Sequence, residues 1–171
     1  LQYAEAYHNR GVAYANLDQY ERAIQDFDEA IRLDPQDALA YIARGEAYVT
    51  LDQDEKAIQD FDEAIRLDPQ NALAYIARGE TYDTLDQYGR AIQDFAEAIR
   101  LNPHYSEAYC DRGVAYASLD QDEQAIQDFD EAIRLDPQDA LHYMNRGAAY
   151  TRLDQYEQAI QDFDGALPLH P

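Results

Sequence analysis

A five-residue motif, Ala-Ile-Gln-Asp-Phe, recurs along this chain at a constant spacing of 34 residues. Its copies begin at Ala23, Ala57, Ala91, Ala125 and Ala159. A fixed period of this length indicates that one small unit is repeated in tandem and that no unit can bury a core of its own. The units must therefore stack on one another, which disfavours most classes of enzyme and favours an elongated array.

Each copy carries two stretches of helical periodicity. In the first copy, Ala4, Tyr7 and Gly11 are separated by three and four residues, and Phe27 and Ala30 continue a second such stretch. These spacings place side chains on one face of an α-helix. We therefore predict a helix, a tight turn, a second helix and another turn in every copy. The copies are residues 4–37, 38–71, 72–105, 106–139 and 140–171, and residues 1–3 are a remnant of a preceding copy or an added segment.

The turns carry sequence signals of their own. Asp18 followed by Glu21 is a capping pattern, which predicts that Asp18 caps the second helix of the first copy. Gly89 stands in place of this glutamate in the third copy, so we expect a weaker helix start there. A proline disfavours helix in the residue before it, which predicts that each second helix ends just before a proline. These prolines are Pro35, Pro69, Pro103 and Pro137.

The combined pattern resembles the tetratricopeptide repeat (TPR) family over residues 4–171. The residues that carry the resemblance in the first copy are Tyr7, Gly11, Tyr14, Ala23, Phe27, Ala30 and Pro35. The resemblance implies an all-α fold, a right-handed α-solenoid of antiparallel helix pairs. It also implies a non-catalytic scaffold that holds a peptide or helix of a partner protein in a concave groove lined by the first helices.

Two departures from the family pattern have structural consequences. The family often has glycine in the turn within the repeat, where this chain has Asp18 and its equivalents. The last copy has Gly165 and Pro168 where the first copy has glutamate and arginine. We expect Pro168 to end the last helix early and leave its apolar face open.

Several residues recur in register and are predicted to serve packing. The phenylalanines, such as Phe27, occupy one repeat position, as buried core residues of stacked copies must. The first-helix glycine Gly45 is expected to face the small residues Ala57 and Ala64. An arginine and an aspartate also recur in all five copies. We interpret them as an ion pair within each repeat, such as Arg10 with Asp26, although an anion-binding clamp is the alternative.

Candidate binding residues lie at first-helix positions where the copies differ. By resemblance to the family, these positions line the concave groove. The candidates are Leu39, Ile42, Glu46, Val49, Leu73, Ile76, Glu80, Asp83, Cys110, Val114 and Met144. They combine apolar side chains with an acidic cluster at Glu46, Glu80 and Asp83. This composition favours a protein or peptide partner with apolar and basic residues.

The charge and composition exclude other classes of partner. The formal net charge is −22, which argues against nucleic acid and against an anionic membrane surface. The four histidines are scattered and Cys110 is the one cysteine, so we expect no metal site, cofactor or intrachain disulfide. No signal or membrane-spanning segment is visible, which favours a cytoplasmic location.

Two alternative functions stay open at this point. The copies are so similar that the open C-terminal face of one chain should fit the N-terminal face of another, giving a homo-oligomer that assembles end to end. The array could also be a recently amplified or design-like segment without a dedicated ligand.

Overall fold

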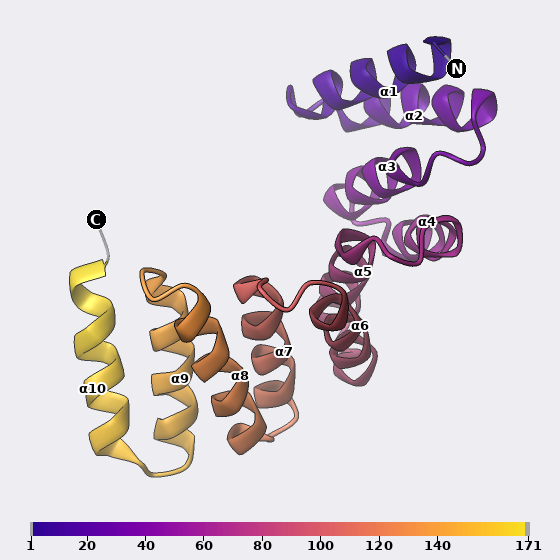
Figure 1. The fold of residues 1–171 in the computed structure, drawn as a ribbon. Coiled ribbons are helices and arrows are strands. Elements are labelled where there is room, and N and C mark those ends of the chain that lie inside the picture. The colour runs from indigo at the N-terminus through magenta and orange to yellow at the C-terminus, as the bar shows by residue number, and fades with distance from the viewer. Residues whose placement is uncertain (1, 170–171) are drawn as a thin grey trace. The chain divides into compact units, whose positions relative to one another are not determined.

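The computed structural model describes residues 2–169, which fold as helices joined by tight turns (Figure 1). The helices are α1 (Gln2–Ala15), α2 (Tyr20–Leu33), α3 (Ala38–Thr50), α4 (Asp54–Leu67), α5 (Ala72–Thr84), α6 (Tyr88–Leu101), α7 (Ser106–Ser118), α8 (Asp122–Leu135), α9 (Ala140–Arg152), α10 (Tyr156–Ala166) and a 3-10 helix (Leu167–Leu169). Each copy thus holds two helices, which confirms the predicted all-α fold of helix pairs. Leu1 of the first segment and residues 170–171 of the last copy lie outside the described residues.

The chain forms two compact units that divide between Thr81 and Tyr82, within α5. In the first unit, α1 packs on α2, α2 on α3 and α3 on α4. In the second unit, α6 packs on α7, α7 on α8, α8 on α9 and α9 on α10. Neighbours in sequence are therefore neighbours in space within each unit, as in helical repeat proteins. A single array over residues 4–171 and its right-handed twist stay predictions.

The recurring phenylalanine forms the centre of each repeat. Phe61 is fully buried and clusters with Ala57, Ala64 and Ala74. The prediction that Gly45 faces Ala57 and Ala64 overlooked the nearest neighbour, because a Cβ atom at Gly45 would lie 2.5 Å from Cε1 of Phe61. The aromatic ring, rather than a small residue, therefore requires glycine on the first helix. The same contact recurs at Gly11, Gly113 and Gly147.

The turn within each repeat depends on an aspartate in the left-handed region. Asp18 has φ 56°, a conformation that glycine and, less often, aspartate adopt. Its Oδ1 accepts a hydrogen bond from the Tyr20 hydroxyl at 3.0 Å. The capping prediction is wrong, because Gln19 is the N-cap residue of α2 and no side chain caps this helix. Asp18 instead takes the conformational role of the family's glycine. Its equivalents are Asp52, Asp86, Asp120 and Asp154, with φ between 56° and 58°.

The expected weak start of α6 is not visible in its bounds. α6 begins at Tyr88, the position equivalent to Tyr20 at the start of α2, and both helices contain fourteen residues. Gly89 removes no side-chain cap, because these second helices have none that a glutamate could complete, and the strength of this helix start stays a prediction.

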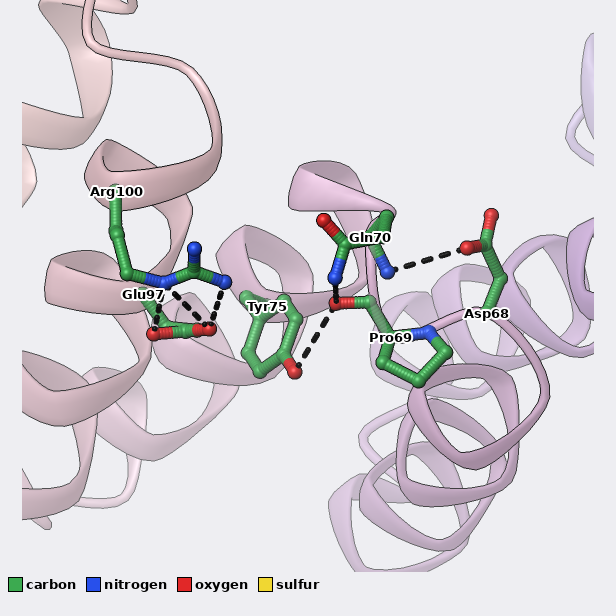
Figure 2. A network of polar contacts seen from close by, with 6 residues as sticks. All are labelled: Asp68, Pro69, Gln70, Tyr75, Glu97 and Arg100. Carbon is green, nitrogen blue, oxygen red and sulfur yellow. Dashed lines mark hydrogen bonds and ion pairs between the residues drawn. The ribbon is translucent and has the colours of Figure 1, made fainter.

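The turn between repeats ends each second helix as predicted. α4 ends at Leu67, and Asp68 Oδ1 then accepts a hydrogen bond from the backbone N–H of Gln70 at 3.1 Å (Figure 2). The Tyr75 hydroxyl donates to the backbone oxygen of Pro69 at 3.5 Å. Figure 2 also shows the ion pair that Arg100 makes with Glu97, one turn earlier on α6.

The last helix is shorter than the other second helices. α10 ends at Ala166 after eleven residues, whereas α8 continues for fourteen. This confirms the predicted effect of Pro168, whose ring is incompatible with the interior of an α-helix.

Candidate functional site

The recurring arginine makes the predicted ion pair within the repeat. Arg44 donates from Nε and Nη2 to the two carboxylate oxygens of Asp60, at 2.8 and 2.6 Å. The same two-bond pair joins Arg10 to Asp26. It also joins Arg112 to Asp128 and Arg146 to Asp162. These pairs confirm that the arginine and the aspartate serve the scaffold.

The structure also shows contacts of this arginine that the sequence did not predict. Nη1 of Arg44 donates at 2.6 Å to Asp28 of the preceding repeat. The guanidinium lies over the rings of Tyr41 and Tyr48, 5.6 and 5.9 Å from their centroids, in cation–π geometry. Most donors of Arg44 are therefore used inside the protein, which leaves little capacity to clamp an external anion.

A pocket of about 290 Å³ opens between α1, α2 and α3 in the first unit. It is lined by Val12, Ala15, Asn16, Tyr20, Phe27, Ala43, Glu46, Ala47 and Thr50. Apolar side chains dominate the walls, and Glu46 brings a carboxylate to them. The Thr50 hydroxyl donates to the backbone oxygen of Glu46 at 3.0 Å.

The acidic residues Glu46 and Glu80 are exposed to solvent, but the surrounding protein desolvates each of them in part. Burial raises the pKa of Glu46 above its ordinary range. Burial also raises the pKa of Glu80, and the nearby charge of Glu46 raises it further. Within residues 2–169, no arginine, lysine or histidine forms an ion pair with Glu46. An exposed carboxylate that is partly desolvated and has no counter-ion within the protein is favourably placed to bind a cation.

Asp83 follows Glu80 by three residues on α5, so both lie on one side of that helix. Burial raises the pKa of Asp83, and the charge of Asp86 adds to this effect. Its Oδ1 is buried and has no hydrogen-bond partner.

An equivalent pocket in the second unit differs in charge. It also measures about 290 Å³ and is lined by Val114, Ala117, Ser118, Phe129, Asn145, Ala148 and Arg152. Ala148 occupies the repeat position of Glu46. Arg152 donates from Nε to Asp122 at 2.7 Å, so its charge is already compensated. The second pocket therefore has the volume and the lining positions of the first without its unpaired carboxylate.

The structure separates the predicted groove residues into exposed and buried groups. The side chains of Leu39, Leu73 and Met144 are 48–55% exposed. Val49 is half-buried, and Val114 lines the second pocket. The other three apolar candidates, Ile42, Ile76 and Cys110, are only 3–7% exposed.

These three buried residues do not fit an open groove. Ile42 belongs to the cluster around Phe61, and Cys110 to the cluster around Phe129. The side chains of Ile42 and Cys110 pack toward the phenylalanine of the same repeat, whereas Met144, at the same repeat position of the last copy, is exposed. We therefore assign the three buried residues to the core.

Sequence reasoning also missed residues that line the first pocket. Asn16 follows the end of α1, and Thr50 is the last residue of α3. A signal for them exists, because this repeat position differs in nearly every copy. It is occupied by Asn16, Thr50, Thr84, Ser118 and Arg152.

Metal-binding and membrane-spanning features are both missing from residues 2–169. No group of three histidine, cysteine, aspartate or glutamate residues in that part of the chain is arranged to hold a metal ion. None of the described helices combines the length and the apolar character needed to cross a membrane.

Comparison with known proteins gives a consistent result. Family profiles described as "Tetratricopeptide repeat" match residues 4–37, 72–105, 106–139 and 129–161, and one described as "TPR repeat" matches residues 45–86. A sequence comparison with curated proteins gives no match.

Solved structures with the same fold span nearly the whole chain. The crystal structure of MamA is 25% identical, covers 93% of both chains and has a TM-score of 0.87. The MamA 41-end fragment from Desulfovibrio magneticus RS-1 is 24% identical, covers 97% of this chain and 94% of its own, and has a TM-score of 0.90. YrrB, a TPR protein with an unusual peptide-binding site, is 27% identical over 96% of this chain and 85% of its own, with a TM-score of 0.81. The 34-residue period, the helix pairs and these matches together show that the chain belongs to the tetratricopeptide repeat family.

Proposed function

We propose that this protein is a non-catalytic scaffold that binds a peptide or helical segment of a partner protein along its first helices. The single observation that carries the proposal is the pocket between α1, α2 and α3, whose apolar walls include the unpaired carboxylate of Glu46. Such a site suits an aliphatic stem that ends in a positive charge, as in lysine or arginine. The partner segment would therefore place a basic residue next to apolar ones.

The exposed leucines support the apolar part of this proposal. Leu39 and Leu73 occupy the same repeat position near the starts of α3 and α5, and both are more than half exposed. An apolar side chain of the partner would bury them, which supplies binding free energy without a charge. YrrB, which has the same fold, carries a peptide-binding site, and this likeness supports a peptide as the class of ligand.

The two equivalent pockets predict where the basic residue binds. The first pocket has Glu46, whereas the second has Ala148 at the same position and an internally paired Arg152. A basic side chain should therefore prefer the first pocket. The second pocket has no unpaired carboxylate, so it should not select for charge.

The test uses short random peptides displayed on phage and selected on the purified 171-residue chain. We expect the selected peptides to be enriched in lysine or arginine next to apolar residues. Their affinity, measured by isothermal titration calorimetry, should fall about ten-fold in Glu46→Gln, which removes a charge-assisted contact at nearly constant shape.

A matched variant makes this test sharper. Ala148→Glu places a carboxylate in the second pocket, and it should leave binding of the selected peptides through the first pocket unchanged. Selected peptides without basic residues, or equal affinity for the parent chain and Glu46→Gln, would contradict the proposed charge recognition.

A further inference from the structure

Repeats that follow one another within a unit are joined by a recurring junction. A small residue on the first helix of one repeat covers the phenylalanine on the second helix of the repeat before it. Ala47 of α3 clusters with Phe27 of α2, and Ala149 of α9 clusters with Phe129 of α8. Each covered phenylalanine is at most 1% exposed.

An ion pair crosses the same junction. Arg44 on α3 donates to Asp28 on α2, and Arg146 on α9 donates to Asp130 on α8. The junction between α6 and α7 has Ala96 in place of this aspartate, and these helices still pack. The ion pair therefore adds to a junction that apolar contact can make by itself.

The α10 face presents one half of this junction without the other. The side chains of Ile160, Phe163 and Leu167 are 59%, 40% and 73% exposed. Within residues 2–169, the elements that pack on α10 are α9 and the 3-10 helix. Asp164 is exposed and occupies the repeat position of Asp28.

The α1 face presents the complementary half. Ala6 and Ala13 are exposed, whereas their equivalents Ala40 and Ala47 on α3 are buried. The Arg10 side chain is 59% exposed, compared with 18–20% for the equivalent arginines of later repeats. A hollow of about 230 Å³ on this face is lined by Tyr3, Ala6, Tyr7 and Arg10.

We propose that these two faces bind each other between molecules, so that α10 of one copy of this chain packs on α1 of a second copy. The small residues Ala6 and Ala13 of the second copy then cover Phe163. Arg10 of the second copy pairs with Asp164, as Arg44 pairs with Asp28 inside the chain. This contact is heterologous, so each bound copy still offers a free face and the assembly can grow.

The net charge of the chain opposes this association. Each copy carries a formal charge of −22, so copies repel one another at low ionic strength. At about 1 M salt the Debye length falls to about 3 Å, which removes most of this repulsion and leaves the apolar contact. Association should therefore increase with salt.

The experiment measures sedimentation velocity of the 171-residue chain over a concentration series in about 1 M NaCl. Ala6→Glu blocks the α1 face, and Ile160→Glu blocks the α10 face. Because both residues are exposed, neither substitution disturbs the core. The dissociation constant of self-association should be at least about ten-fold higher for each variant than for the parent, because a charged side chain replaces an apolar contact. Gln127→Glu is the matched control, because it adds the same charge at an exposed position of α8 on neither face.

Mixing the two blocked variants separates this geometry from other modes of association. Each blocked variant keeps one intact face, and the two intact faces are complementary. The mixture should therefore form a one-to-one dimer that neither variant forms alone and that does not grow. A parent chain that stays monomeric throughout the series, equal association of all variants, or a mixture without dimers would each overturn the proposal.

Discussion

Gly45→Ala should destabilise the protein even though alanine is the better helix former. The added Cβ would lie 2.5, 2.9 and 3.0 Å from three ring carbons of Phe61, well inside the 3.4–4 Å of ordinary contacts. Phe61 is fully buried, so its ring cannot move aside without disturbing the alanines around it. Overpacking of this kind costs about 1–3 kcal/mol, and the better helix propensity of alanine returns about 0.5–1 kcal/mol.

Gly89→Ala is the matched control, because a Cβ there meets nothing within 4 Å. This variant should gain only the stability that comes from the better helix propensity of alanine. The unfolding free energies of the two variants should therefore differ by about 1–3 kcal/mol. Urea unfolding followed by far-ultraviolet circular dichroism measures both. A second comparison places Gly45→Ala in a Phe61→Leu background. The smaller leucine side chain should remove most of the loss in unfolding free energy that Gly45→Ala causes beside Phe61. If Gly45→Ala raises the unfolding midpoint as Gly89→Ala does, the argument from ring contact fails.

Three further predictions follow from the ion pairs and the titrating groups. Asp60→Ala should lower the unfolding free energy by about 3 kcal/mol, because it leaves the mostly buried Arg44 without its main partner. Asp26→Ala should lower it by less in the same urea titration, because Arg10, the partner of Asp26, is exposed to solvent. Burial raises the pKa of Cys110 to about 11, so its thiol should resist a disulfide reagent at pH 8 in the native protein and react once urea unfolds the chain. Burial raises the pKa of Glu46 in the folded protein above its ordinary value of 4.5, so ionisation of this carboxyl group destabilises the fold as the pH rises above 4.5. Glu46→Gln should therefore be more stable than the parent at pH 7, and the difference in unfolding free energy should shrink as the pH falls toward 4.5.

The sequence predicted the features that depend on local pattern or on repetition. Helix positions follow from periodicity, helix ends from Pro35 and its equivalents, and the Arg10–Asp26 pair from its recurrence in every copy. Asp18 was misjudged because aspartate favours both helix caps and left-handed turns, and the sequence alone does not separate these roles. The sequence did not separate buried Ile42 from the exposed groove candidates, because an apolar residue on the first helix fits the same pattern whether it faces Phe61 or a partner.

The charge environment of the candidate site also lay beyond the sequence. The acidic cluster was visible as a pattern, but the partial desolvation of Glu46 depends on how the fold packs other residues around it. His142 is a further case, because it replaces the alanine of the other four copies and is buried without a hydrogen bond to either ring nitrogen. Its Nε2 lies 3.8 Å from Oδ2 of Asp139, the N-cap residue of α9, and nothing else in the structure explains this substitution.

The arginine ion pairs bear on how the length of such a chain can change in evolution. Arg44 reaches Asp28 sixteen residues before it and Asp60 sixteen residues after it. Deletion of residues 38–71 removes one whole period and leaves Arg78, which normally bonds Asp62, at that same distance from Asp28. The remaining junction would be rebuilt from the same residue types. Recombination between copies within the gene can therefore shorten or lengthen the protein without leaving an unmatched surface inside it. The number of repeats can therefore drift in whole steps, while a deletion of any other length would place residues of different repeat positions against one another.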